Sequence, residues 1–186
     1  MATRTAGSPA TLRHGVNVLR ALANNLESLA ATEVEAPLDH PSARDAVTLL
    51  GWHGECTSEA LQEALDLSQP ACVRVVDRLA AAGLVARRRT PGDRRLRIRL
   101  TARGERAAAR LVRQSGTGVE AALSAALPEA ERLEDFVAAL DRVAAVVFGD
   151  AHDTVRFCRS CDVSACLGGP RGCPSAAACQ ANLAEL

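Results

Sequence analysis

"LSQPACVRVVDRLAAAGLVARRRTPGDRRLRIRLT", residues 67–101, decides the fold, because it changes from a helical to an alternating pattern. Its first half predicts a helix that has Ser68 or Gln69 as the N-cap, Pro70 in the first turn and Gly83 at the end. Over residues 95–100, arginine and apolar residues alternate, which is the pattern of a β-strand with one buried face. The stretch therefore predicts a helix followed by a basic strand.

The neighbouring residues complete a recognisable unit. Residues 84–89 are a weaker partner strand, and the turn-forming residues 90–93 (TPGD) join the two strands into a hairpin. Upstream, "TSEALQEALDL" predicts a short helix with Thr57 or Ser58 as its N-cap. Because only a few residues separate this helix from the next, the pair is typical of a helix-turn-helix. The basic hairpin that follows it is then a wing.

The flanking sequence predicts more helix. A stripe of apolar residues at spacings of three and four runs from Leu12 to Leu29. Further helices are expected from Ser42 to Trp52, from Thr101 towards Leu127 with a bend near Gly116, and from near Pro128 to residue 149. The last of these should bury its apolar face: Leu133, Phe136, Val137, Leu140, Val143 and Val147. The expected fold class is mainly α (α+β), a winged helix-turn-helix with a helical dimerisation domain and a short β-hairpin wing.

The charge distribution favours a polyanionic partner. The net charge is zero, yet residues 68–113 hold thirteen arginines against Asp77, Asp93 and Glu105, a local charge of +10, while each flank carries −5. So many like charges repel one another unless they face solvent or a polyanion. No secretory signal and no apolar run of about 18 residues or more is found, so we expect a cytoplasmic protein with no membrane contact. Because no catalytic constellation emerges either, we do not expect an enzyme.

The helix from Ser68 is the expected reading head, since a helix of this kind fits the major groove of B-DNA. Val73, Val76 and Leu79 are expected to face inward. Arg74 and Arg78 lie four residues apart on one face and could pair with guanine or hold a phosphate. The candidates for its outer face are Ser68, Gln69, Ala71, Cys72, Arg74, Val75 and Arg78. At the wing tip, Asp93, Arg94 and Arg95 are candidates for the minor groove, where arginine is favoured.

The element order, "DRLAAAGLV" at the end of the helix, the Asp93-x-Arg95 wing motif and the closing "RLTARGE" resemble the MarR family of bacterial transcription regulators. The resemblance covers about residues 11–148. It implies a homodimer on palindromic double-stranded DNA, with Arg95 held by Asp93 in the minor groove. The expected domains are a dimerisation region (11–34 and 102–150), a winged helix-turn-helix (42–101) and a cysteine-rich tail (151–186). The apolar stripes of the first and last helices independently favour a dimer, because one small domain could not bury them.

The tail departs from the family pattern. Four cysteines lie within sixteen residues, in the spacing Cys158-x2-Cys161-x4-Cys166-x6-Cys173, and Pro174 follows the last of them. Four thiolates can hold an iron–sulfur cluster, for which compact spacing and a terminal Cys-Pro are typical, or a structural zinc ion. Disulfides would require an oxidising compartment, which nothing in the sequence supports. We expect the cluster, with zinc as the alternative. Four further residues are set aside as more typical of packing or capping: Cys56, Cys72 and Cys179 as packing thiols and His152 as a helix cap.

The sequence as a whole predicts a homodimeric transcription regulator, expected to be a repressor, whose DNA binding is modulated by the cluster. Gain, loss or oxidation of the cluster would reorder a loop that closely follows the last dimerisation helix. Two alternatives remain open. One is a repressor that senses a small phenolic ligand and has only structural zinc in its tail. The other is an iron–sulfur electron-transfer protein, against which the +10 segment argues.

Overall fold

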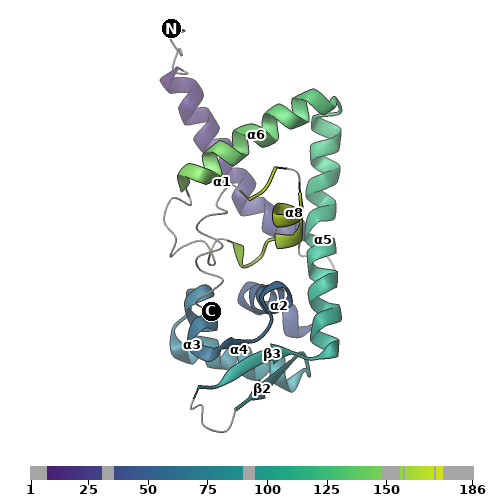
Figure 1. The fold of residues 1–186 in the computed structure, drawn as a ribbon. Coiled ribbons are helices and arrows are strands. Elements are labelled where there is room, and N and C mark those ends of the chain that lie inside the picture. The colour runs from purple at the N-terminus through teal and green to yellow at the C-terminus, as the bar shows by residue number, and fades with distance from the viewer. Residues whose placement is uncertain are drawn as a thin grey trace.

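The computed structural model describes residues 8–30, 36–89, 95–147, 156, 158–169 and 171–173. Two layers are visible in Figure 1: a lower one of short helices with a small sheet, and an upper one of longer helices. The helix α5 runs from the lower layer to the upper one. Confirming the expected class, the described part is mainly helical with one three-stranded antiparallel sheet in the order β1-β3-β2.

The lower layer is the winged helix-turn-helix. It contains the 3-10 turn η1 (Ala36–Leu38), α2 (Pro41–His53), β1 (Cys56–Thr57), α3 (Ser58–Ala64), α4 (Gln69–Ala81), β2 (Val85–Arg88) and β3 (Arg97–Leu100). The caps follow from the sequence. Thr57 accepts the N–H of Ala60 and begins α3, Ser68 is the N-cap residue of α4, and Gly83 has the positive φ (+69°) that reverses the chain after α4.

The sheet agrees with the predicted hairpin and adds one strand. In the β2–β3 pair, Val85 lies opposite Leu100 and Arg88 opposite Arg97. Ile98 and Leu100 are buried and Arg99 is exposed, so the alternation is confirmed. β1 pairs Cys56 with Ile98 and was not predicted, because two residues are too few to show a period.

The core lies between α2, α3, α4, the sheet and the start of α5. Its largest fully buried side chains are Leu49, Leu50, Leu61, Leu79, Leu84, Ile98, Val47 and Cys72. Thr101 links the sheet to α5, since its hydroxyl donates to the carbonyl of Gly83 at 2.6 Å and accepts the N–H of Gly104 at 3.1 Å. The first turns of α5 are thereby fixed to the winged helix.

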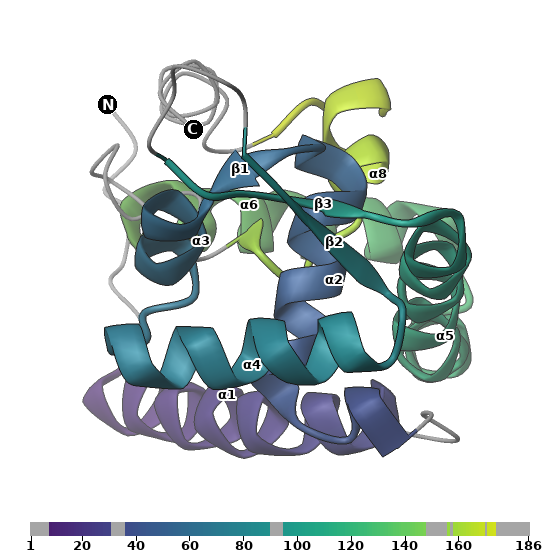
Figure 2. The same ribbon diagram turned by 90° about the horizontal axis from the view of Figure 1, so that it is seen from below.

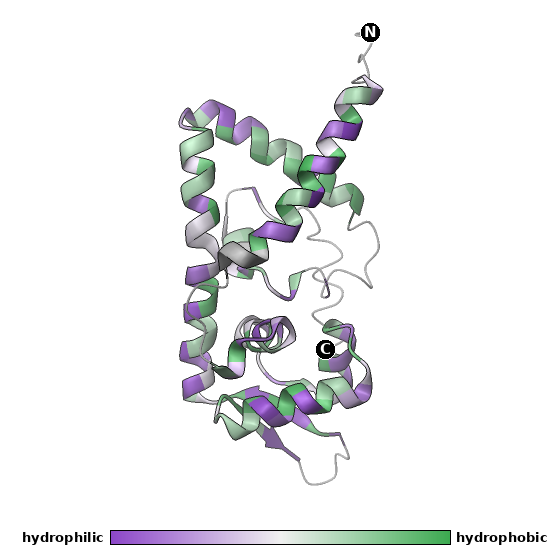
Figure 3. Ribbon diagram, turned by 180° about the vertical axis from the view of Figure 1, so that it is seen from behind, coloured by the Kyte–Doolittle hydropathy of each residue, from purple (hydrophilic) through white to green (hydrophobic). Residues whose placement is uncertain are grey.

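The upper layer contains α1 (Pro9–Ala30), the far part of α5 (Ala102–Ala126) and α6 (Ala130–Val147). α5 continues as one helix through Gly116, where the sequence suggested a bend. The prediction that α6 buries its apolar residues is wrong for the single chain, in which no residue of α6 is buried. Leu12 of α1 is 69 % exposed and Val146 of α6 is 82 % exposed. These apolar faces are expected to pack against a second protomer, which a single chain does not include. Figure 3 shows apolar residues spread along both helices.

The described part of the tail includes the short helix α8 (Val163–Gly168), which lies between the two layers (Figure 1). Asp162 caps it by accepting the N–H groups of Ser164 and Ala165. Val163 is buried.

Candidate nucleic-acid interface

α4 lies on the outside of the winged helix, as Figure 2 shows from below, and it carries most of the predicted reading residues. Ser68, Gln69, Arg74 and Arg78 are exposed, and Ala71 is half-buried. Their side chains are available to a groove that receives the helix. These five predicted positions therefore remain candidates on geometric grounds.

The predicted orientation of two α4 residues is wrong. Cys72, a candidate for the outer face, is 1 % exposed, whereas Val73, expected inside, is 44 % exposed. The buried stripe of α4 is Cys72, Val76 and Leu79, at spacings of four and three, and Val73 lies about 100° around the helix from its neighbour. Cys72 is thus a core residue, and Val73 joins Arg74 on the outer face, where it could contact a thymine methyl group.

Acidic side chains hold some of the arginines near this face. Nη1 of Arg78 lies 3.3 Å from Oδ1 of Asp39, and Arg87 of β2 pairs with Asp77 of α4. Both pairs are largely exposed, so they stabilise the fold weakly and can be exchanged for phosphate contacts. Arg78 can reach DNA only by leaving Asp39 or by sharing it.

The wing is only partly within the described residues. Arg95 is exposed where the chain enters β3, but Asp93 and Arg94 lie outside the described residues. The expected Asp93–Arg95 contact therefore stays a prediction. At the base of the wing, Nε of Arg97 lies 3.8 Å from Oε1 of Glu55 and is directed towards the protein.

A second basic surface was missed by the sequence analysis. Arg103, Arg106, Arg110 and Arg113 line one exposed groove along the first half of α5. Nη1 of Arg103 donates to the carbonyl of Ala82 at 2.8 Å, which places the start of this row beside the C-terminal end of α4. The spacings of three, four and three were visible in the sequence as one helix face. The row belongs to the +10 segment and extends its positive charge beyond α4 and the wing.

The tail cysteines are partly gathered. A hydrogen bond from Cys158 lowers the pKa of the Cys161 thiol to about 7. Burial raises the pKa of Cys166, and the nearby charges of Cys173 and Cys161 raise it further. In the part of the chain that is described, however, no three His, Cys, Asp or Glu side chains are arranged to hold one metal ion. All four thiols are thus neighbours on one segment, but in this conformation they do not converge on a single centre.

The remaining cysteines behave as packing residues where they are described. Burial raises the pKa of Cys56 to about 12, and it also raises the pKa of Cys72. Both thiols are therefore protonated and poorly reactive at neutral pH. Cys179 and His152 lie outside the described residues.

Comparison with solved structures shows which known proteins share this fold. The fold superposes on a MarR family protein from Bacillus stearothermophilus with a TM-score of 0.66, at 24 % identity over 76 % of this chain and 99 % of that one. For MepR, a transcription regulator of the Staphylococcus aureus multidrug efflux pump MepA, the TM-score is 0.61 at 19 % identity, over 71 % and 97 %. For BpsR of Bordetella bronchiseptica, whose DNA binding is regulated by 6-hydroxynicotinic acid, it is 0.54 at 17 % identity, over 70 % and 98 %. The chain thus shares the winged-helix fold of these proteins.

The sequence itself is similar to one family over part of its length. Residues 40–96 match the model of the MarR family. This segment runs from the N-cap of α2 to the residue before β3 and includes both helices of the helix-turn-helix. MepR, one of the proteins that share this fold, is a transcription regulator. No curated protein sequence matches the chain. Within the described residues, no helix has the length and apolar character needed to cross a membrane.

Proposed function

We propose that the protein is a homodimeric repressor that binds a palindromic operator in double-stranded DNA, and that it works in the cytoplasm. The observation that carries the proposal is the outer face of α4, where Gln69, Val73 and Arg74 are exposed on a rigid winged helix. A helix of this size fits the major groove, and arginine there can make a bidentate contact with guanine. Arg95, at the base of the wing tip, is proposed to enter the adjacent minor groove.

The apolar helices of the upper layer support the homodimer. α1 exposes Leu12, Val16, Leu19 and Leu22 along one stripe. α6 exposes Phe136, Leu140, Val143, Val146 and Val147. An apolar surface of this extent is unusual on a monomer and typical of an interface. A twofold dimer would hold its two α4 helices over half-sites about one turn of DNA, roughly 34–36 Å, apart.

Selection of bound duplexes from a pool of random sequence tests this proposal directly. We expect enrichment of a palindrome with two half-sites, bound by the dimer. Arg74→Ala and Arg95→Ala should each weaken binding by about tenfold or more, because each removes a groove contact. Arg132→Ala on α6 is the matched control, since it removes the same charge far from α4. Equal binding by all three variants, or no enrichment at all, would contradict the proposal.

The four tail cysteines are proposed to hold an iron–sulfur cluster that modulates DNA binding. Their clustering on one segment and the contact between Cys158 and Cys161 support this. A cluster would supply a group whose oxidation or loss changes the order of the loop. Since the four thiols do not converge in this conformation, the loop would have to close around the cluster. Zinc in a site of four thiolates is the alternative ligand and needs the same closure.

Purification without air separates these possibilities. An iron–sulfur cluster gives a brown protein that contains iron and sulfide, whereas a zinc site gives a colourless protein with about one zinc ion per chain. Cys161→Ser should abolish metal binding, and Cys179→Ser, outside the compact run, should retain it. Protein without iron or zinc would contradict both versions. A cluster in a protein that binds no DNA would favour the electron-transfer alternative.

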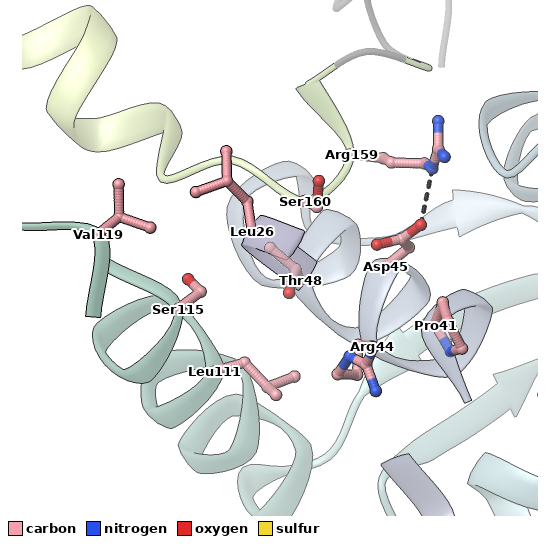
Figure 4. Close-up of a pocket in the computed structure, with 10 residues that line it drawn as sticks. All are labelled: Leu26, Pro41, Arg44, Asp45, Thr48, Leu111, Ser115, Val119, Arg159 and Ser160. Carbon is pink, nitrogen blue, oxygen red and sulfur yellow. Dashed lines mark hydrogen bonds and ion pairs between the residues drawn. The ribbon is translucent and has the colours of Figure 1, made fainter. Parts of the chain in front are cut away.

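One observation favours a second function, the sensing of a small molecule. A cleft of about 220 Å³ lies between α1, α2, α5 and the tail, and it has both apolar and charged walls (Figure 4). Its volume is below the roughly 300–1,000 Å³ typical of ligand pockets, so it suits only a small ligand. Titration with 6-hydroxynicotinic acid, the ligand of BpsR, tests this function. Release of operator DNA at ligand concentrations that saturate binding would support it.

A further inference from the structure

The tail is fixed to the winged helix by two arginines. Nε of Arg159 donates to Oδ2 of Asp45 on α2 at 2.7 Å, as Figure 4 shows, and the Asp45 side chain is only 17 % exposed. Arg156 pairs with Asp66, which lies in the turn between α3 and α4 and has a positive φ of 53°. The tail therefore contacts the turn of the helix-turn-helix as well as the helix behind it.

The same segment is fixed to the upper layer a few residues later. Arg171 donates from Nη1 to Glu134 at 2.5 Å and from Nε to Asp141 at 3.0 Å, and both acceptors are on α6. One guanidinium thus holds two carboxylates seven residues apart on one helix. Such charge-assisted pairs have a defined geometry and are stronger than neutral hydrogen bonds.

Between its two attachment points the tail packs against the rest of the chain. Val163 of α8 is buried, and Arg159 and Ser160 form one wall of the cleft between α1, α2 and α5. α5 connects the two layers covalently, and the tail connects them a second time through ion pairs (Figure 1). A rotation of the winged helix about α5 would therefore have to break the pair at Asp45 or the pairs on α6.

We propose that residues 156–173 act as a strap that holds the winged helix at a fixed angle to α6 and so preorganises the two reading heads of the dimer for the operator. This inference rests on the proposed DNA-binding function and specifies its regulation. Preorganised heads bind more tightly because less freedom is lost on binding. Cys161 and Cys166 lie between the attachment points at Arg159 and Arg171. A change in the order of this loop would therefore change how firmly the strap holds the winged helix.

Three variants test the strap. Arg156→Gln with Arg159→Gln releases the winged-helix end, Arg171→Gln releases the α6 end, and the combined variant with all three changes releases both. Arg132→Gln is the control, because it removes an arginine of α6 that pairs with Glu129, just before that helix, and not with an acidic partner of the tail. Operator affinity and hydrogen exchange of the α8 amides are measured on full-length dimer purified without air, with the operator selected above.

Each strap variant should weaken operator binding by about fivefold or more, the lower end of ordinary coupling between sites. The combined variant should bind no more weakly than the variant released at one end, since a strap released at one end no longer restrains the winged helix. Exchange of the α8 amides should become about tenfold faster in all three. The control should match the wild type in both measurements.

The outcomes separate this inference from the proposed function. If the wild type binds no operator, the proposed function fails and the strap with it. If the wild type binds and the variants bind equally well or more tightly, only the strap is overturned. Additive losses in the combined variant, or unchanged exchange in α8, would also overturn it, since the two ends of the segment would then act separately.

Discussion

Gly104 lies where α5 passes closest to the sheet, and its replacement by alanine should loosen that junction. A Cβ at this position would lie 2.0 Å from the carbonyl oxygen of Leu84 and 3.1 Å from Cδ2 of Leu100. Real Cβ atoms stay at least 3.0 Å from such an oxygen, so the two backbones must separate by about 1 Å. The same oxygen accepts the N–H of Thr101 at 3.0 Å, and the separation would weaken that bond as well.

The magnitude follows from three contributions. Overpacking of this kind costs about 1–3 kcal/mol, and a weakened hydrogen bond costs about 1 kcal/mol. Alanine gains about 1 kcal/mol over glycine within a helix. The net loss in the free energy of unfolding is therefore about 1–3 kcal/mol. For a chain of this size that corresponds to a fall in Tm of about 2–12 °C.

Urea denaturation at one fixed protomer concentration measures this effect, because dimer stability depends on concentration. Gly116→Ala on the same helix is the matched control. Its Cβ would meet only the end of the flexible Glu120 side chain, at 3.1 Å, so the variant should be as stable as the wild type or slightly more stable. If Gly104→Ala were as stable as the wild type, or if both variants lost the same stability, the close approach of α5 to Leu84 would be refuted.

Three other predictions concern single side chains. Thr101→Ala should cost about 1–2 kcal/mol in urea denaturation, because it removes the cap of α5 and the bond to Gly83, whereas Thr101→Ser should retain most of the stability. Burial lowers the pKa of His53, so the unfolded chain binds a proton more readily than the folded chain. The contribution of His53 to the free energy of unfolding should be fully present above pH 6.5 and should fall below it, and His53→Gln should flatten that pH dependence. In metal-free protein at pH 7.5, iodoacetamide should modify Cys161 first and should leave Cys56 unmodified until the chain unfolds. Mass analysis of peptides would show the order of modification, and rapid labelling of Cys56 would contradict its burial.

The local elements could be predicted from the sequence because their signals are local. Thr57 and Thr101 cap their helices as their positions before apolar helical stretches predicted. The strand Arg97–Leu100 follows from the alternation of arginine and apolar residues. The order of helix, helix and basic hairpin predicts the winged helix without any knowledge of tertiary contacts. Each of these features depends on a few consecutive residues whose periodicity or capping chemistry leaves little choice.

Periodicity did not determine which side of α4 faces inward. Residues 71–76 are nearly all small or apolar, so Cys72 and Val73 both fit a buried stripe, and only the packing of α4 against α2 and the sheet decided for Cys72. The same holds for β1, which exists because Cys56 finds Ile98 across the sheet. The exposed face of α6 shows a different limit. Its apolar stripe predicts that the face is buried, but the stripe does not say which surface covers it.

For the tail, the sequence by itself determined the presence of four closely spaced thiols and the arginines among them. Only the tertiary structure paired Arg159 with Asp45 and Arg171 with Asp141. Arg159 and Asp45 are 114 residues apart, and no local pattern relates positions so distant along the chain. Chain-local physics thus set the helices, their caps and the wing, whereas the angle between the layers and the contacts that hold it arise only when distant charges are brought together by packing.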